Sequence, residues 1–194
     1  MNIEKIISYA KPMDPILLGS GDLLSYLIRY AQKPQTLDGK PSLHSHGMLF
    51  WSFDTVIEST MDFTPYPTRK LDNGVQFNYL KNHADAPMAM LMHFPWTDAE
   101  REILKREALR LKAEGISYSV SGLLGSLLSY WIFPWASNPL QSKHSLNCSA
   151  FIQECCVPMG IDFDPKHTAR NTSPEMISQY EMEGLEKIDC SEGK

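Results

Sequence analysis

The pattern of apolar and polar residues along the chain predicts several short strands. Apolar runs of this length, bounded by turn-forming residues, are typical of strands. They occur at residues 14–22 (a strand followed by a turn), 44–50, 55–60, about 75–80 and 87–94. The last run is apolar enough to be buried on both faces of a sheet.

Helical spacing of apolar residues predicts helices between and after these strands. Residues 23–32 place Leu24, Leu27 and Ile28 on one apolar side. The clearest helix follows Thr97, whose spacing to Glu100 is that of a capping box. Its outward face is expected to carry Arg101, Lys105 and Lys112. Further helices are predicted at 147–157 and after Ser173, and residues 116–142 read as a short helix and an irregular apolar loop.

Length and composition are those of an ordinary globular domain. The chain has 194 residues, of which 43% are hydrophobic and 21% are charged, and a chain of this size fits one hydrophobic core. We therefore expect a single α+β domain over residues 1–194, with its core at about 14–180. The acidic tail, residues 181–194, is expected to fray.

Charge and hydropathy exclude some classes of protein. The net charge is −5, the pI is about 5.7, and no Lys/Arg-rich run occurs, so no nucleic-acid partner is expected. No apolar run reaches the roughly 18 residues that a spanning helix needs, although peripheral membrane contact is compatible with the sequence. The N-terminal residues lack a signal-peptide pattern. We expect a cytoplasmic protein, or one delivered by another route, as a bacterial or phage product could be.

The cysteines do not form a metal-binding pattern. Cys148, Cys155, Cys156 and Cys190 include no CxxC pair, and free thiols are the default reading for a chain without an export signal. His44 and His46 could bind a metal only with a third ligand, which no spacing marks. We expect neither a metal nor an organic cofactor.

The histidine-containing strand is a candidate part of a catalytic site. Side chains alternate across a strand, so His44 and His46 would share a face, as would Val56 and Glu58 in the next strand. A carboxylate in an apolar strand is costly to bury without a partner. A histidine beside Glu58 would provide that partner, and Glu58 would orient the imidazole.

Cys148 is the candidate nucleophile. It lies near the start of a predicted helix, where unpaired backbone N–H groups and the helix dipole stabilise a thiolate. A histidine that holds its proton and a carboxylate behind the histidine would complete a catalytic triad, and the helix N-terminus could stabilise an oxyanion. The alternative is that Cys148 is a buried cysteine that acts as a small hydrophobic residue.

Five segments occur in an order typical of one protein family. They are GSGDLLSYLIRYAQ, SHGMLF, DTVIEST, YSVSGLLG and NCSAFIQECC. Together they resemble the circularly permuted papain-like amidases of the YiiX type, which are relatives of the NlpC cell-wall peptidases. The resemblance spans about residues 14–180. It implies a papain-like core, in which an antiparallel sheet packs against the helix that carries the nucleophilic cysteine.

The resemblance also implies roles for individual residues. His46 matches the base, Glu58 the third member of the triad, and Cys148 the nucleophile. Tyr118 matches a tyrosine that lies near the nucleophile in related peptidases. His44 and Asn147 are candidate accessory residues. The family's small residue usually stands second after the histidine, whereas Gly47 directly follows His46. A shift of one position would make His44 the base.

The function that follows is cysteine-dependent hydrolysis of an amide or ester. The resemblance implies peptides, peptidoglycan fragments or lipid acyl esters as substrates. Two alternatives remain open: a thiol acyltransferase that uses the same residues, and a non-catalytic binding module that keeps the fold. Trp131, Phe133 and Trp135 are either packing residues or a lid or acyl-binding wall beside Cys148.

Overall fold

The computed structural model describes residues 1–61, 73–118, 122–123, 125, 131, 144–165 and 171–192. Within these residues the chain forms an α+β structure with one antiparallel six-stranded sheet, in the order β4-β3-β2-β1-β5-β6. The strands are β1 (Pro15–Gly19), β2 (His46–Ser52), β3 (Thr55–Thr60), β4 (Gly74–Tyr79), β5 (Met88–His93) and β6 (Glu186–Asp189). The α-helices are α1 (Ile3–Tyr9), α2 (Leu23–Ala31), α3 (Asp98–Ala113), α5 (Cys148–Cys156) and α6 (Pro174–Gln179). Short 3₁₀ helices are η1 (Lys33–Gln35), η2 (Leu80–His83) and η3 (Val157–Met159).

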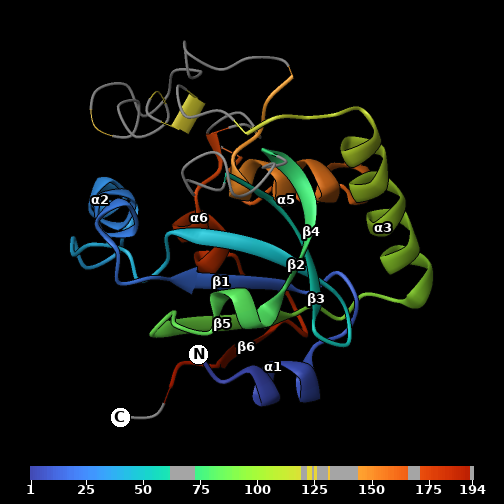
Figure 1. The fold of residues 1–194 in the computed structure, drawn as a ribbon, viewed down its shortest axis with the longest axis horizontal. Coiled ribbons are helices and arrows are strands. Elements are labelled where there is room, and N and C mark those ends of the chain that lie inside the picture. The colour runs from blue at the N-terminus through green and yellow to red at the C-terminus, as the bar shows by residue number, and fades with distance from the viewer. Residues whose placement is uncertain are drawn as a thin grey trace, which may run out of the picture.

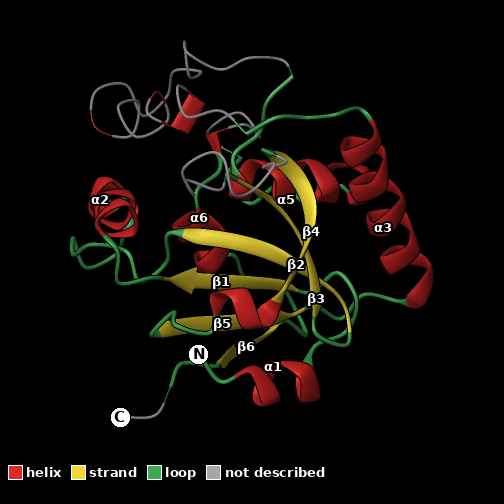
Figure 2. Ribbon diagram, in the orientation of Figure 1, coloured by secondary structure: helices red, strands yellow, loops and turns green. Residues whose placement is uncertain are grey.

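The sheet separates two apolar layers. Figures 1 and 2 show how the helices and strands are arranged around it. Neighbouring residues of a strand point to opposite faces. Leu17 and Leu49 therefore pack on one side with the buried residues of α3 and α5, while Ile16 and Met48 pack on the other side with Ile6 of α1. Both faces of β1 and β2 are covered, which explains why these strands are almost continuously apolar.

The helix α5 lies against the sheet and positions the cysteine. Eight of its nine residues are buried, Glu154 being the exception, as expected for a helix enclosed on all sides. It contacts β2, β3 and α3. The predicted arrangement of an antiparallel sheet against the Cys148 helix is therefore present in the structure.

Most predicted elements form where the apolar pattern places them. The predicted strand 55–60 coincides with β3, whereas β2 begins at His46, so that His44 precedes the strand. The capping box of Thr97 and Glu100 forms at the start of α3. Asp22 and Ser173 cap α2 and α6, because their side-chain oxygens accept hydrogen bonds from backbone N–H groups of the first turn.

The predicted apolar side of α2 is not a buried face. Leu24 is 39% exposed and Leu27 52% exposed, whereas Ile28 is 8% exposed. Periodicity shows which residues share a side of a helix, but it does not show which side another element covers. None of the helices in the described residues has the length and apolar character needed to cross a bilayer.

Arg101, predicted to face outward from α3, is instead buried. Its guanidinium donates hydrogen bonds to the Asp14 carboxylate (2.7 Å) and to the backbone carbonyls of Pro12 (2.6 Å) and Phe94 (2.8 Å). Asp14 is itself fully buried and also contacts His93 Nδ1 at 2.6 Å. Burial of the arginine is favourable because it gives a buried carboxylate a charged partner. His93 itself is partly buried, with its side chain 20% exposed.

The C-terminal tail is more ordered than predicted. We expected residues 181–194 to fray, but residues 186–189 form β6 at the edge of the sheet and pair with β5. Ile188 lies opposite Leu91, and the buried Cys190 donates its backbone N–H to Ala89 at 2.7 Å. The open edge of β5 supplies backbone partners that the tail composition does not reveal.

Candidate functional site

Cys148 is the first residue of α5, as predicted from the residues that precede the helix. Asn147 caps the helix, and its Oδ1 accepts hydrogen bonds from the backbone N–H of Ala150 (2.8 Å) and from Ser149 Oγ (3.2 Å). The side chain of Asn147 therefore serves the helix end and fixes where the helix begins. Cys148 is placed among backbone N–H groups that have no partner within the helix.

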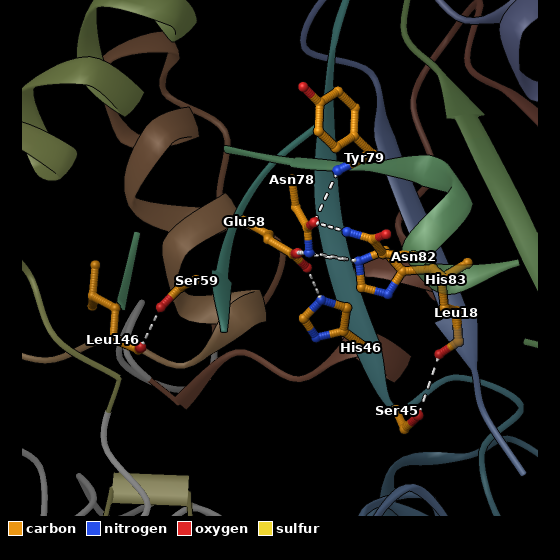
Figure 3. A network of polar contacts seen from close by, with 10 residues as sticks. All are labelled: Leu18, Ser45, His46, Glu58, Ser59, Asn78, Tyr79, Asn82, His83 and Leu146. Atoms are coloured by element: carbon orange, nitrogen blue, oxygen red, sulfur yellow. Dashed lines mark hydrogen bonds and ion pairs between the residues drawn. The ribbon is translucent and has the colours of Figure 1, made fainter. Parts of the chain in front are cut away.

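His46, the first residue of β2, connects Cys148 to Glu58. Its ring and the Cys148 thiol lie close enough to act on each other's pKa, and its Nε2 lies 2.5 Å from Glu58 Oε2 (Figure 3). Since Nε2 faces the carboxylate, Nδ1 is the nitrogen left for the sulfur. The His46 side chain is 20% exposed, while that of Glu58 is fully buried. The three predicted catalytic residues are thus brought together.

Strand register explains why Glu58 reaches His46. In the antiparallel pair β2–β3, Leu49 lies opposite Ile57, and both point toward α5. Glu58 is the next residue of β3 and points to the other face. His46 is an odd number of residues from Leu49 and shares that other face with Glu58. A register shift of one residue would separate the imidazole from the carboxylate.

Gly47 allows α5 to approach β2 closely. A Cβ atom at this position would lie 2.8 Å from Ile152 Cδ1 and 3.3 Å from Leu17 Cδ2. The backbone N–H of Gly47 also helps to lower the pKa of Cys148. The small residue directly after the histidine therefore serves both packing and the nucleophile.

The charges of the three groups favour a thiolate–imidazolium pair. Burial alone would raise the pKa of Cys148, but the charge and hydrogen bond of His46 and the N–H groups of Gly47 and Ser149 lower it below its usual value. Burial would likewise lower the pKa of His46, but Cys148 and then Glu58 raise it to about 10. Against the effect of its burial, His46 and then His83 hold the pKa of Glu58 well below its usual value.

The other three cysteines have the opposite character. Burial raises the pKa of Cys155, of Cys156 and of Cys190. All four cysteines are free. Because the thiolate is the nucleophilic form of cysteine, Cys148 is the residue suited to attack a substrate.

Two residues that sequence reasoning missed also contact Glu58. Asn78 Nδ2 donates to Glu58 Oε1 at 2.7 Å, and His83 Nε2 lies 3.1 Å from the same oxygen (Figure 3). His83 is the last residue of η2, which follows β4 directly. For Asn78, the available sequence signal was the alternation of side chains in β4. Asn78 shares a face of the strand with Gln76, and Gln76 is the residue that pairs with Glu58.

His44 lies away from the nucleophile. It is buried, and its Nδ1 has no hydrogen-bond partner among the residues that the structure describes. Burial, followed by the charge of Arg29, lowers its pKa to about 4. Its ring lines a cavity of about 430 Å³ together with Met90 and Glu175, whereas Cys148 lines a different one. The structure therefore brings His46, and not His44, to Cys148.

The remaining predicted residues have different outcomes. Burial, together with the negative charge of Cys148, raises the pKa of Tyr118. Trp131 is 52% exposed and stacks on Tyr30 of α2 with ring centroids 6.2 Å apart. Its Nε1 donates to the Ala31 carbonyl at 3.0 Å. Phe133 and Trp135 lie outside the described residues.

A small cavity lies beside Cys148. Its wall combines apolar groups with hydroxyl and amide groups, contributed by Ile28, Gln32, Ser45, Leu123, Asn147, Ser149, Ser173 and Pro174. Within the part of the chain that the structure describes, no group of three histidine, cysteine or carboxylate residues could hold a metal ion. No protein-family model matches the sequence, and a search of curated proteins also gives no match. The geometry of the site is therefore the basis on which its chemistry can be proposed.

Proposed function

We propose that this protein is a cysteine hydrolase that cleaves an amide or ester bond. Cys148 is the nucleophile, His46 transfers protons, and Glu58 orients His46. The arrangement that carries the proposal links three side chains: the Cys148 thiol and the His46 ring act on each other's pKa, and His46 Nε2 lies 2.5 Å from the buried Glu58 carboxylate. Such a chain of a nucleophile, a base and an orienting group is the common logic of catalytic triads.

The first half-reaction forms a thioester. The Cys148 thiolate attacks the substrate carbonyl carbon, and the carbonyl oxygen takes the negative charge. Backbone N–H groups at the start of α5 stabilise that charge. The His46 imidazolium then donates its proton to the leaving nitrogen or oxygen as the carbon–heteroatom bond breaks. An amine or alcohol leaves, the acyl group stays on Cys148, and His46 becomes neutral.

The second half-reaction restores the enzyme. Neutral His46 removes a proton from water, and the resulting hydroxide attacks the thioester carbonyl. The carbon–sulfur bond breaks, the carboxylic acid is released, and the thiolate–imidazolium pair forms again. Glu58 accepts a hydrogen bond from His46 Nε2 throughout, which keeps Nδ1 directed at the reacting atoms. No step requires a metal or an organic cofactor.

The resemblance to circularly permuted papain-like amidases supports the proposal. Its support lies in chain order, because the histidine strand precedes the cysteine helix and both lie at one antiparallel sheet. The cavity beside Cys148 combines apolar and hydrogen-bonding walls. Acyl groups of peptides, peptidoglycan fragments or lipids are the substrate classes that we propose to test.

A direct test uses mass spectrometry and activated substrates. Wild-type protein is incubated with a p-nitrophenyl ester, a muropeptide and a phospholipid, and Cys148 is examined for an acyl adduct. We expect a transient adduct on Cys148 and release of the carboxylic acid. Both should be lost in Cys148→Ala and strongly reduced in His46→Ala. No adduct and no product from any of the three substrate classes would favour a non-catalytic binding module.

The fate of the acyl group distinguishes hydrolysis from transfer. Repeating the reaction with an added amine or alcohol offers the thioester a second acceptor besides water. A hydrolase should still release mainly the free acid. If the acyl group passes mainly to the acceptor, with the same dependence on Cys148 and His46, the protein is an acyltransferase.

A further inference from the structure

Each carboxylate oxygen of Glu58 has its own partners. His46 binds Oε2, while Asn78 and His83 both bind Oε1, at 2.7 and 3.1 Å (Figure 3). The Glu58 side chain is fully buried, and a buried carboxylate oxygen without donors is costly. The two donors on Oε1 therefore fix the orientation that turns Oε2 toward His46.

The backbone sets the orientation of the Asn78 amide. Its Oδ1 accepts hydrogen bonds from the Tyr79 backbone N–H at 2.9 Å and from Asn82 Nδ2 at 2.5 Å. Because a backbone N–H can only donate, the oxygen of the amide must face it. The NH₂ group of Asn78 is consequently directed at Glu58 (Figure 3).

His83 provides two restraints at once. Because the carboxylate only accepts hydrogen bonds, His83 Nε2 carries the hydrogen in its contact with Glu58. Asn78 Nδ2 is 3.4 Å from this nitrogen, which fits two donors that share one oxygen. The His83 ring also lies over the His46 ring, with centroids 5.7 Å apart and planes 21° from parallel. It thus limits rotation of His46 from one side.

We propose that His83, with Asn78 behind it, is a positioning residue for the Cys148–His46 pair and acts through Glu58. The inference rests on the proposed function and adds a residue to it. Loss of the His83 donor would leave Glu58 Oε1 with one partner, and the carboxylate could turn away from His46. The imidazolium would then be less stable, and the Cys148 thiol would hold its proton to a higher pH.

Several titratable groups determine this pH dependence. They come from separate elements and are His46 on β2, Glu58 on β3, His83 on η2, Cys148 on α5, and Tyr118, whose pKa the charge of Cys148 raises. Substitution of one of them therefore changes the reaction of Cys148 with a thiol reagent in a measurable way. A loss of packing alone would lower stability without moving the pH profile.

Two substitutions separate the hydrogen bond from the ring contact. His83→Phe keeps an aromatic ring beside His46 but removes the donor, and His83→Gln keeps a donor but removes the ring. His93 offers a matched control, because its side chain is also 20% exposed and also contacts a fully buried carboxylate, that of Asp14. His93→Phe removes that contact on a different part of the sheet. His83→Leu replaces His83→Phe if the phenylalanine variant does not fold.

The experiment measures the rate at which iodoacetamide alkylates Cys148 as a function of pH, followed by peptide mass spectrometry. We expect His83→Phe to move the acid-side midpoint upward by about 0.5 to 1 pH unit, which corresponds to roughly 3- to 10-fold slower alkylation below the midpoint. His83→Gln should recover most of the wild-type profile, and His93→Phe should leave it unchanged.

The outcomes distinguish this inference from the proposed function. If wild-type Cys148 reacts no faster than the other three thiols at about pH 6, where an ordinary thiol is protonated, the proposed function fails. If wild-type Cys148 reacts fast and the pH profile of His83→Phe coincides with that of the wild-type protein, His83 has no positioning role. The same conclusion follows if His93→Phe moves the midpoint as far as His83→Phe does.

Discussion

His46 and Glu58 lie on neighbouring strands and meet at 2.5 Å through Nε2 and Oε2. This contact fixes which nitrogen of the imidazole faces the Cys148 sulfur. It also places a negative charge behind the imidazole, in a position where burial would otherwise favour its neutral form. The reactivity of Cys148 therefore depends on a residue that does not touch it.

Replacement of Glu58 by glutamine tests this dependence. Glu58→Gln keeps the shape of the side chain but removes the charge, so the pKa of His46 should fall from about 10 and the pKa of Cys148 should rise. We expect alkylation of Cys148 at about pH 6 to slow by at least roughly 10-fold, since one pKa unit is a tenfold change in thiolate. Unchanged alkylation in a folded variant would show that Glu58 does not act on the pair.

Gly47 should be sensitive to a single added methyl group. In Gly47→Ala the new Cβ would lie 2.8 Å from Ile152 Cδ1, so α5 must shift or Ile152 must change rotamer. We expect a loss of about 1 kcal/mol in the free energy of unfolding, together with slower alkylation of Cys148. Gly21→Ala is the matched control, because no atom lies within 4 Å of a Cβ at that position. Denaturant unfolding of both variants provides the comparison, and equal losses would contradict this role for Gly47.

His44 should make stability depend on pH. Its folded-state pKa is about 4, below the value of 6.5 for a free side chain. Between these two pKa values the unfolded chain therefore binds more protons than the folded chain. The contribution of neutral His44 to the free energy of unfolding is fully present above pH 6.5 and is lost as the pH falls toward 4. The loss is about 3 kcal/mol on the basis of the two pKa values. His44→Leu should unfold with a flatter pH dependence across this window, and identical slopes would contradict burial of a neutral His44.

The two sides of α2 should differ in their contribution to stability. Ile28 is 8% exposed and lines the cavity beside Cys148, while Leu27 is 52% exposed. We expect Ile28→Ala to cost about 2 kcal/mol and Leu27→Ala less than about 0.5 kcal/mol. Thermal or denaturant unfolding measures both. A large loss in Leu27→Ala would show that this side of α2 is covered in solution.

The sequence pattern predicted the local structure well because short-range signals determine it. Strand β3, the capping box at Thr97 and the helix that starts at Cys148 depend on alternation and capping within a few residues. The pairing of Glu58 with a histidine also followed from one rule, that a buried carboxylate needs a partner.

Features that depend on long-range contacts could not be predicted. Burial of Arg101 depends on Asp14, which is 87 residues away in the chain. The strand formed by residues 186–189 depends on the open edge of β5. His83 became part of the site because η2 follows β4 directly and returns over the face that carries Glu58. None of these contacts has a signal within a short window of sequence.

The most direct test of the central claim is a titration of the Cys148 thiolate. The ultraviolet absorbance of wild-type protein minus that of Cys148→Ala isolates this one sulfur as pH is raised. Because His46 and two backbone N–H groups stabilise the thiolate, its absorbance should already be developed at neutral pH and should require His46. A thiolate that forms only at or above about pH 8.5, the value for an ordinary cysteine, would contradict the thiolate–imidazolium pair.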